Sequence, residues 1–335
     1  LNFQSSDDTY IVDYDTAGQA INLVYSDATV GWTPSSDIAN ALEPFTNITQ
    51  KAIFGYGKTG SAVSITNLVN SSGVIAADVS GVGTARDILA ATSYGGDKAI
   101  FGYGNSSSYT SLTNLVSNSG VVSADVSGVG TARRALTAAK YGTDKAIFGY
   151  GYTGSASSLT NLVSNVGVVA ADVTGVGTAR YGLAAASYGT DKVIFGYGST
   201  GSSVSLTNLA SNTGVVATDV TGVGTARFYL AACGYGTDKA IFAYGVGDDD
   251  SDLSLSNLVS SSGVVATDVT GVGTVRRAAA ASSYGGDKAI FGYGYAGGNV
   301  SVSNLVSSSG VVAADVTGVG TARHGAAATG YSNSA

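Results

Sequence analysis

Four short apolar runs recur in a constant order along most of the chain. A unit reads "LAAASYG", then "KAIFGYG", then "SLTNLVS", and closes with "GVVAADVTGVG". The runs are rich in Val, Ile, Phe and Tyr, and turn signals such as "SNTG" and "YGTD" separate them. No segment carries a helical stripe, and the glycine content opposes helix. The pattern therefore predicts four β-strands per unit and an all-β protein.

The repeat has a nearly fixed length. The lysine that opens "K-[AV]-I-F" recurs at a spacing of 47 residues four times and then 49, at Lys51, Lys98, Lys145, Lys192, Lys239 and Lys288. Four antiparallel strands in such a period are typical of a β-propeller blade, and 335 residues hold about seven units. A solenoid is the alternative, but it needs atypical capping units at both ends. We expect one domain over residues 1–335, a seven-bladed β-propeller of four-stranded blades.

Blades are numbered from their first strand. The expected blades are 39–85, 86–132, 133–179, 180–226, 227–275, 276–322, and a composite of 323–335 with 1–38. The first of these lacks the opening arginine, and its first strand is expected to begin near Ala39.

The two chain ends carry complementary parts of a unit. The last copy, Arg323–Ala335, holds a first strand but never receives its "DKAIFGYG". At the other end, "DDTYIVDYD" (7–15) aligns with "TDKVIFGYG", so the first 38 residues predict strands two to four of a divergent unit. We expect the ring to close by pairing these ends, which removes free sheet edges. The start at Leu1, without a methionine, predicts a chain that is processed or cut from a longer polypeptide.

The order of an arginine, a small apolar strand, "IFGYG", "NLV" and an outer strand resembles kelch-type propeller repeats. In that family a glycine pair closes strand two and a tryptophan sits in strand four; here the pair is "GYG", and the tryptophan occurs only as Trp32. The units are also similar to repeats in predicted structural proteins of bacteriophages and bacterial surfaces. These resemblances imply a propeller fold and a structural or surface protein.

Composition narrows the classes of partner. Hydrophobic residues make up 44% of the chain and charged residues 12%, with 48 glycines, two prolines and no methionine. This suits an extracellular or virion-surface β-protein. The formal net charge of −7 opposes a nucleic-acid partner. No stretch approaches 18 continuous apolar residues, so we expect no membrane insertion.

Little in the sequence predicts catalysis. The single histidine, His324, excludes a multi-histidine metal site, and the lone Cys233 is expected to be a small buried apolar residue. We therefore expect no enzyme and no cofactor. The aspartates found once per unit are predicted to be structural, through bonds to arginine or backbone that tie strand four to the next blade. They are Asp78, Asp125, Asp172, Asp219, Asp268 and Asp315.

One acidic cluster coincides with the two-residue insertion in "VGDDDSDLS". A solvated acidic loop is one interpretation of it, and a Ca²⁺ site is the other. The metal ligands would be Asp248, Asp249, Asp250 and Asp252.

Two positions differ strongly between otherwise similar units. One directly follows the repeated arginine, and the other follows "GYG" or "AYG". Adjacent antiparallel strands bring these places to the same side, so both sets are expected on one face, around the mouth of a central channel. Neutral drift on an inert surface is one explanation of the variation, and a ligand site is the other. The candidate ligand-binding residues are Asp87, Arg134, Tyr152, Tyr181, Phe228, Tyr229, Arg277, Tyr295 and His324.

Three functions follow as hypotheses. The first is a non-enzymatic adhesion or receptor-binding module on a virion or cell surface that binds glycan or protein through the variable face. The second is an architectural virion subunit, such as a tail, fibre or capsid decoration, whose partners are other virion subunits. The third is a carboxylate-dependent polysaccharide lyase or hydrolase.

Overall fold

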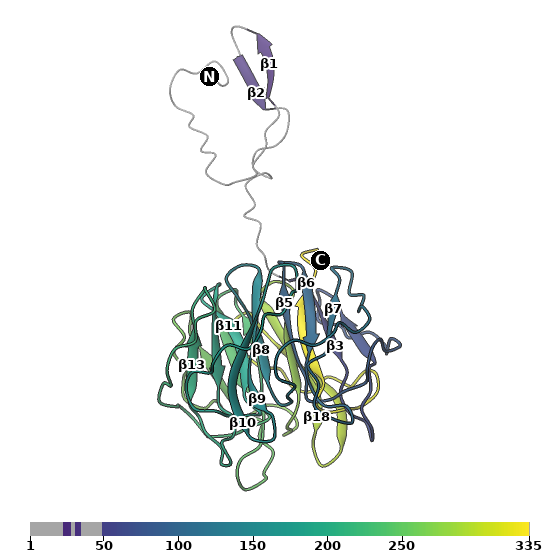
Figure 1. The fold of residues 1–335 in the computed structure, drawn as a ribbon. Helices are drawn as coiled ribbons and strands as arrows, with labels where there is room; N and C mark the ends of the chain where they lie inside the picture. The colour runs from purple at the N-terminus through teal and green to yellow at the C-terminus, as the bar shows by residue number, and fades with distance from the viewer. Residues whose placement is uncertain (1–22, 28–30, 35–48, 335) are drawn as a thin grey trace. The chain divides into compact units, whose positions relative to one another are not determined.

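The computed structural model describes residues 23–27, 31–34 and 49–334 (Figure 1). The chain divides into two units, Leu1–Thr46 and Asn47–Ala335, each described here by itself. In the first unit, β1 (Leu23–Asp27) and β2 (Gly31–Pro34) form an antiparallel hairpin. The other strands expected in residues 1–38 lie outside the described residues. Over the part of the chain that the structure describes, no helix is long and apolar enough to cross a membrane.

The second unit contains six antiparallel sheets of three strands each. The first strands are β5 (Ala90–Tyr94), β8 (Thr137–Tyr141), β11 (Ala184–Tyr188), β14 (Ala231–Tyr235), β17 (Ala280–Tyr284) and β20 (Ala327–Tyr331). The second strands, in the middle of each sheet, are β6 (Lys98–Gly102), β9 (Lys145–Tyr152), β12 (Lys192–Gly196), β15 (Lys239–Ala243), β18 (Lys288–Tyr295) and β3 (Lys51–Gly55). The third strands are β7 (Thr113–Val116), β10 (Ala156–Val163), β13 (Thr207–Ala210), β16 (Ser256–Val259), β19 (Asn299–Val306) and β4 (Thr66–Val69).

The six sheets form a closed, propeller-like ring. Each first strand contacts the first strands of two neighbouring sheets, and β20 contacts both β17 and β5. A ring of backbone hydrogen bonds joins the turns between first and second strands. Gly95 N–H donates to Asp144 O in the next sheet at 2.7 Å, the bond recurs in every sheet, and Ser332 N–H closes the circle by donating to Asp97 O at 2.8 Å. The ring therefore closes through six sheets.

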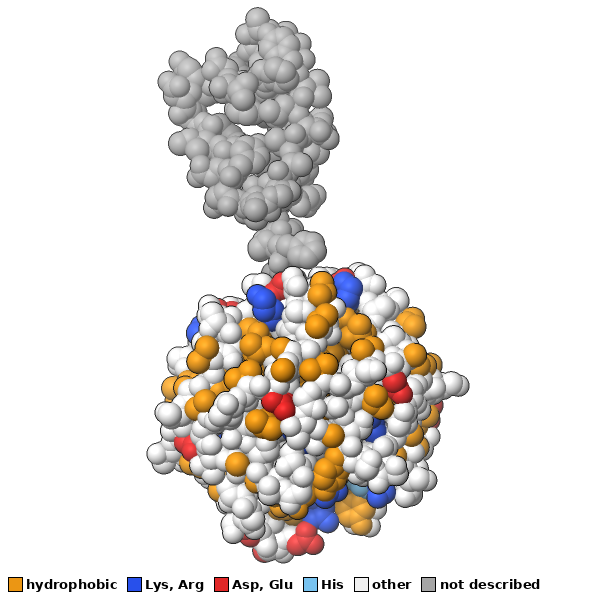
Figure 2. All heavy atoms as spheres, viewed as in Figure 1, with side chains coloured by type: hydrophobic (Ala, Val, Ile, Leu, Met, Phe, Trp, Pro, Cys, Tyr) orange, Lys and Arg blue, Asp and Glu red, His pale blue; other side chains and the backbone are white. Residues whose placement is uncertain are grey.

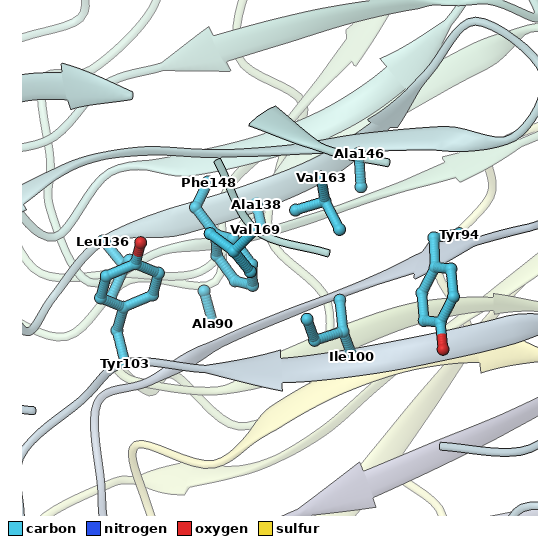
Figure 3. Packing of buried hydrophobic residues seen from close by; sticks show 10 residues of the cluster. All are labelled: Ala90, Tyr94, Ile100, Tyr103, Leu136, Ala138, Ala146, Phe148, Val163 and Val169. Carbon is cyan, nitrogen blue, oxygen red and sulfur yellow. The ribbon is translucent and has the colours of Figure 1, made fainter. Parts of the chain in front are cut away.

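The core lies between neighbouring sheets. Second strands such as "KAIFG" are apolar on both faces because each sheet is packed between two others, and Ile100 and Phe101 are fully buried. Figure 3 shows Ile100 and Tyr103 of one sheet beside Phe148 and Val163 of the next. The rings of Tyr103 and Phe148 meet edge to face at 5.1 Å. This contact between sheets recurs around the ring.

The expected closure by residues 7–15 is wrong. The last strand, β20, pairs with β3: Tyr331 is opposite Lys51, and Ala327 is opposite Gly55. The register matches that of β5 on β6, where Tyr94 is opposite Lys98. The physical reason is that the "KAIFG" of β3 is identical to that of β6, so β3 presents β20 with the same pairing edge that β6 presents to β5. The place expected for a first strand near Ala39 is thus taken by the C-terminal strand.

The expectation of seven four-stranded blades is confirmed only as a repeated all-β arrangement. The structure describes six sheets of three strands, and the fourth apolar run touches the third strand at two isolated bridges, such as Thr113 with Val126 and Val116 with Val122. Between these bridges, the side chain of Asn114 donates to Ser123 O at 3.0 Å. This side chain binds a carbonyl of the run, and no continuous fourth strand forms.

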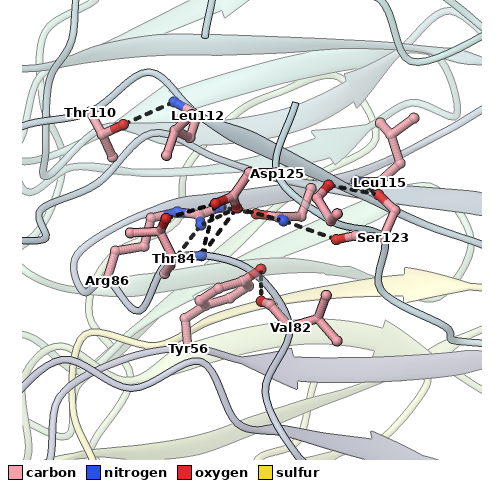
Figure 4. Close-up of polar contacts among 11 residues, drawn as sticks. Tyr56, Val82, Thr84, Arg86, Thr110, Leu112, Leu115, Ser123 and Asp125 are labelled. Carbon is pink, nitrogen blue, oxygen red and sulfur yellow. Dashed lines mark hydrogen bonds and ion pairs between the residues drawn. The ribbon is translucent and has the colours of Figure 1, made fainter. Parts of the chain in front are cut away.

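A buried arginine joins each sheet to its neighbour (Figure 4). Arg86 is fully buried, its Nη2 donates to Asn114 Oδ1 at 2.5 Å, and its guanidinium lies 4.3 Å from the centre of the Tyr56 ring. Asp125 accepts hydrogen bonds from the Thr84 backbone N–H and hydroxyl. Its Oδ1 lies 3.8 Å from Arg86 Nη1. The predicted structural role of these aspartates is confirmed.

The same group recurs at all six junctions. The distance from aspartate to arginine ranges from 3.7 to 4.0 Å. At the junction closed by the two ends of the unit, Asp78 pairs with Arg323 and accepts from Thr321. Each aspartate therefore binds the arginine of the preceding "TAR" segment, and not the arginine eight residues after it.

Candidate functional site at the mouth of the ring

The two positions that vary between repeats meet in pairs at one end of the ring. In every repeat, the residue after the buried arginine forms an isolated antiparallel bridge with the residue after "GYG" or "AYG". The pairs are Asp87–Asn105, Arg134–Tyr152, Tyr181–Ser199, Phe228–Val246, Arg277–Tyr295 and His324–Lys58. We call the surface formed by these pairs the mouth face. It is the end that carries the β9–β10 and β18–β19 hairpins, at the lower edge of Figure 1. The predicted gathering of both variable sets on one face is confirmed.

A closed ring of backbone hydrogen bonds supports the mouth face. Ala135 N–H donates to Ile88 O at 3.0 Å, the bond recurs from each repeat to the one before it, and Ile88 N–H donates to Gly325 O at 2.8 Å. The six residues of the ring all have positive φ, between 49° and 62°, and they are Ile88, Ala135, Gly182, Tyr229, Ala278 and Gly325. Non-glycine residues rarely adopt this conformation, and the surrounding bonds hold it. The backbone frame is thus constant while its side chains differ.

Behind this ring runs a narrow channel along the axis. Its wall near the mouth consists of leucines and alanines, such as Leu89, Leu136 and Ala279, and alanines line its middle. At the opposite end, serines and threonines join Lys140 in the wall. Tyr229 also lines the channel at the mouth end, where the channel opens onto the mouth face.

Aromatic side chains form a continuous row across half of the mouth face. The ring centres of Tyr109 and Tyr152 are 6.1 Å apart, and those of Tyr152 and Tyr181 are 5.2 Å apart. Phe228 lies 6.3 Å from Tyr181 and 5.0 Å from Tyr229. All five rings are partly exposed. The row therefore offers a shelf of aromatic faces and edges together with phenol hydroxyls.

The phenol of Tyr229 interacts electrostatically with groups from several repeats, which are Arg134, Tyr181, Asp87 and Arg277. Burial raises the pKa of its phenol; Arg134 opposes this shift, and the neighbouring phenol of Tyr181 adds to it. The phenol is therefore neutral at pH 7 and able to donate a hydrogen bond.

The other half of the mouth face carries paired charges. Arg277 forms an ion pair with Asp250, and its Nε lies 3.7 Å from Asp252 Oδ1. Its guanidinium lies 5.4 Å from the ring centre of Tyr295, whose ring in turn meets that of His324 at 5.5 Å. In this half, the charge of Arg277 is therefore already paired with carboxylates of the chain.

The single histidine is held by an amide. His324 Nδ1 lies 2.7 Å from Asn299 Oδ1. Burial lowers the pKa of His324; Asp87 opposes the shift, whereas Lys58 and Arg277 add to it. His324 is thus neutral at pH 7. Asp87 differs from the other candidates because it is buried, only 3% exposed, and accepts a bond from Asn105.

The acidic insertion does not gather its carboxylates. Asp248 accepts from Ser203 N–H in the neighbouring repeat and Asp249 accepts from Ser251 N–H, while Asp250 and Asp252 face Arg277. Among the described residues, no three acidic, histidine or cysteine side chains form a group suited to a metal ion. The Ca²⁺ site stays a prediction without a gathered ligand set.

The sequence reasoning missed two residues of this face, Tyr109 and Asn299. Both follow "GYG" by a few residues: Tyr109 lies in a loop, and Asn299 is the first residue of β19. The same signal, variation between repeats, extends to these residues and points to them.

Comparison with known proteins adds no relative. No protein-family model and no curated protein matches the chain. The functional argument therefore depends on the geometry of the mouth face.

Proposed function

We propose that this chain is a non-enzymatic binding module of a virion or cell surface, which holds a glycan or a surface protein on the mouth face. One observation carries the proposal: five aromatic rings and Arg134 form a connected, partly exposed row on a rigid backbone frame. Aromatic side chains with polar ends supply a large contact area at small conformational cost.

The distribution of variation supports the proposal. Repeats that share their core, arginines and turns differ in charge, size and aromaticity at the mouth face. Variable side chains on a constant frame are a common plan of binding proteins. The likeness to kelch-type repeats and to repeats of phage and bacterial surface proteins agrees with a place on the outside of a particle or cell.

The test is a binding screen with matched variants. The purified chain is applied to a glycan array and to intact cells, beside Tyr181→Ala combined with Tyr229→Ala. Alanine is accommodated at position 229, because Ala135 and Ala278 stand at the same place in other repeats with the same positive φ. Lys98→Ala, in the exposed hairpin turn at the opposite end of the ring, is the control.

Binding that the tyrosine variant loses and the lysine variant keeps supports a site on the mouth face. Binding that survives in both variants contradicts it, and turnover of any polysaccharide contradicts the non-enzymatic part.

A second candidate, an architectural subunit, is favoured by exposed valines on the outer runs. One valine at the same place in each repeat is between 61 and 67% exposed: Val74, Val121, Val168, Val215, Val264 and Val311. Figure 2 shows hydrophobic side chains distributed over the side of the ring. Periodic apolar positions suit packing against neighbouring subunits. Ordered assembly at high concentration, abolished by serine at these positions, would support this function.

A further inference from the structure

Arg134 stands on the mouth face without an acidic partner. Its guanidinium lies 5.4 Å from the ring centre of Tyr109 and 5.5 Å from that of Tyr152. Its Nε is buried and has no hydrogen-bond partner. Within residues 49–334, no carboxylate lies within ion-pair distance of it, although the other arginines of this region all have such a partner. The buried Nε atoms of Arg86, Arg180 and Arg276 also lack a hydrogen-bond partner, so the missing carboxylate is what distinguishes Arg134.

The chain contains its own comparison for this arginine. Arg277 occupies the same position in another repeat. Its guanidinium lies 5.4 Å from the ring centre of Tyr295, and that of Arg134 lies 5.5 Å from the ring centre of Tyr152. Arg277 is neutralised by Asp250 and Asp252 from the acidic insertion. The acidic insertion lies in the repeat before that of Arg277; the repeat before that of Arg134 has no such insertion, and its corresponding loop, residues 105–110, reads "NSSSYT". One cation of the pair is therefore satisfied within the chain, and the other is open.

The neighbours of Arg134 specify more than charge. Tyr152 lies beside it, and the ring centre of Tyr181 is 5.2 Å from that of Tyr152. The charge of Arg134 also acts on the neutral phenol of Tyr229. Aromatic rings pack on the apolar faces of sugar rings, while a guanidinium binds a carboxylate through two parallel hydrogen bonds. Cation, aromatic faces and a hydroxyl donor are together the groups that recognise an acidic sugar.

We propose that the mouth face binds an acidic oligosaccharide, with its carboxylate on Arg134 and its sugar rings on Tyr152 and Tyr181. The inference rests on the proposed binding function and names the ligand class for that site. Desolvation by the flanking rings strengthens the ion pair relative to one in open water.

The test uses matched probes that differ only in the acid group. Calorimetry or surface binding compares oligogalacturonate and sialyllactose each with its own methyl ester. At least one acidic probe is expected to bind roughly tenfold or more tightly than its neutral counterpart, since a charge-assisted hydrogen bond is worth 1.4 kcal/mol or more. Sulfated lactose separates a carboxylate preference from a general preference for anions.

Variants locate the effect. Arg134→Ala is expected to remove the preference for the acidic probe, and Arg134→Lys to retain part of it because lysine keeps the charge without the two-pronged geometry. Lys98→Ala removes a positive charge from the hairpin turn at the opposite end of the ring and is expected to leave the preference intact. The melting temperature of each variant shows that the ring is folded.

The possible results separate this inference from the broader function. Equal binding of acidic and neutral probes, a preference only for the sulfated probe, or a preference that persists in Arg134→Ala overturns the acidic-sugar inference. If a neutral glycan or a protein still binds, and the double variant Tyr181→Ala with Tyr229→Ala abolishes that binding, the proposed function stands although the acidic-sugar inference fails. Failure of every acidic probe to bind also overturns the inference.

Discussion

Tyr331 lies opposite Lys51 in the antiparallel pairing of β20 with β3. Tyr331 ends the last strand of the chain, and Lys51 begins the middle strand of the same sheet. The two residues are 280 positions apart, yet their register is that of a hairpin found within every other repeat. The ring is thus closed by a sheet that combines strands from both ends of the unit Asn47–Ala335. The C-terminal strand β20 supplies the first strand for the "KAIFG" of residues 51–55.

Deletion of residues 323–335 is expected to open the ring. It removes β20, the buried Arg323 and its bond to Asn67, and exposes the edge of β3. The melting temperature should fall by about 10 °C or more, or the protein should associate through the free edge. Differential scanning calorimetry and light scattering measure both effects.

Adding a peptide of residues 323–335 in trans should restore part of the stability, whereas a scrambled peptide should not. A truncated chain that stays monomeric and melts as the full chain does would mean that β20 does not close the ring.

Replacing a buried arginine should cost far more than replacing a surface lysine. Arg133→Ala leaves Asn161 and Asp172 without their cation and removes the packing over Tyr103. We expect a loss of about 3–5 kcal/mol in the free energy of unfolding. Chemical denaturation provides the measurement.

The control for this arginine is Lys98→Ala, which breaks an exposed pair with Asp97 and should leave the transition nearly unchanged. Similar losses in both variants would show that the arginine junctions do not hold the sheets together.

Stability should fall in acid through the aspartates of the junctions. Burial alone would raise the pKa of Asp172, but hydrogen bonds from Thr131 and Asn161 and the charge of Arg133 lower the pKa below 3.8 overall. A lowered carboxylate pKa adds stability that is present above pH 3.8 and is lost as pH falls through the lower, folded-state pKa. All six junctions share this arrangement.

Melting temperatures at pH 7, 5, 4 and 3 test this dependence. We expect little change from pH 7 to 5 and a steep loss below pH 4, with a shallower loss in Asp172→Asn. Acid loss of the same steepness in that variant would assign the effect to other groups.

Glycines that end the second strands leave room for a ring from the next sheet. A Cβ on Gly102 would lie 2.7 Å from Phe148 Cζ. Gly102→Val should therefore destabilise the protein by about 3 kcal/mol, while Gly60→Ala, whose Cβ would have no atom within 4 Å, should be neutral. Ala243 stands at the same place as Gly102 in another sheet, so Gly102→Ala should cost less than the valine variant. Urea unfolding ranks the three, and any other order would refute the close approach.

Much of the site was predictable because its geometry is local. Tyr181 and Ser199 meet because a first strand and a second strand joined by a tight turn must bring their far ends together. The structural aspartates were recognisable from their recurrence in every repeat. Which arginine each aspartate binds was not predictable, because Asp125 has Arg86 and Arg133 at comparable places in a periodic sequence, and only the packing of neighbouring sheets distinguishes them.

The all-β repeat, its strand runs and the pairing of the two variable positions can be read from the amino-acid sequence, since all of these depend on contacts within one repeat. The pairing of β20 with β3 and the closure of the ring by six sheets are visible only in the folded chain, because identical strands offer equivalent partners to a distant chain end. The tertiary structure also decided that Arg277 is neutralised while Arg134 is not, since that difference depends on how an inserted loop folds back onto one position of the next repeat.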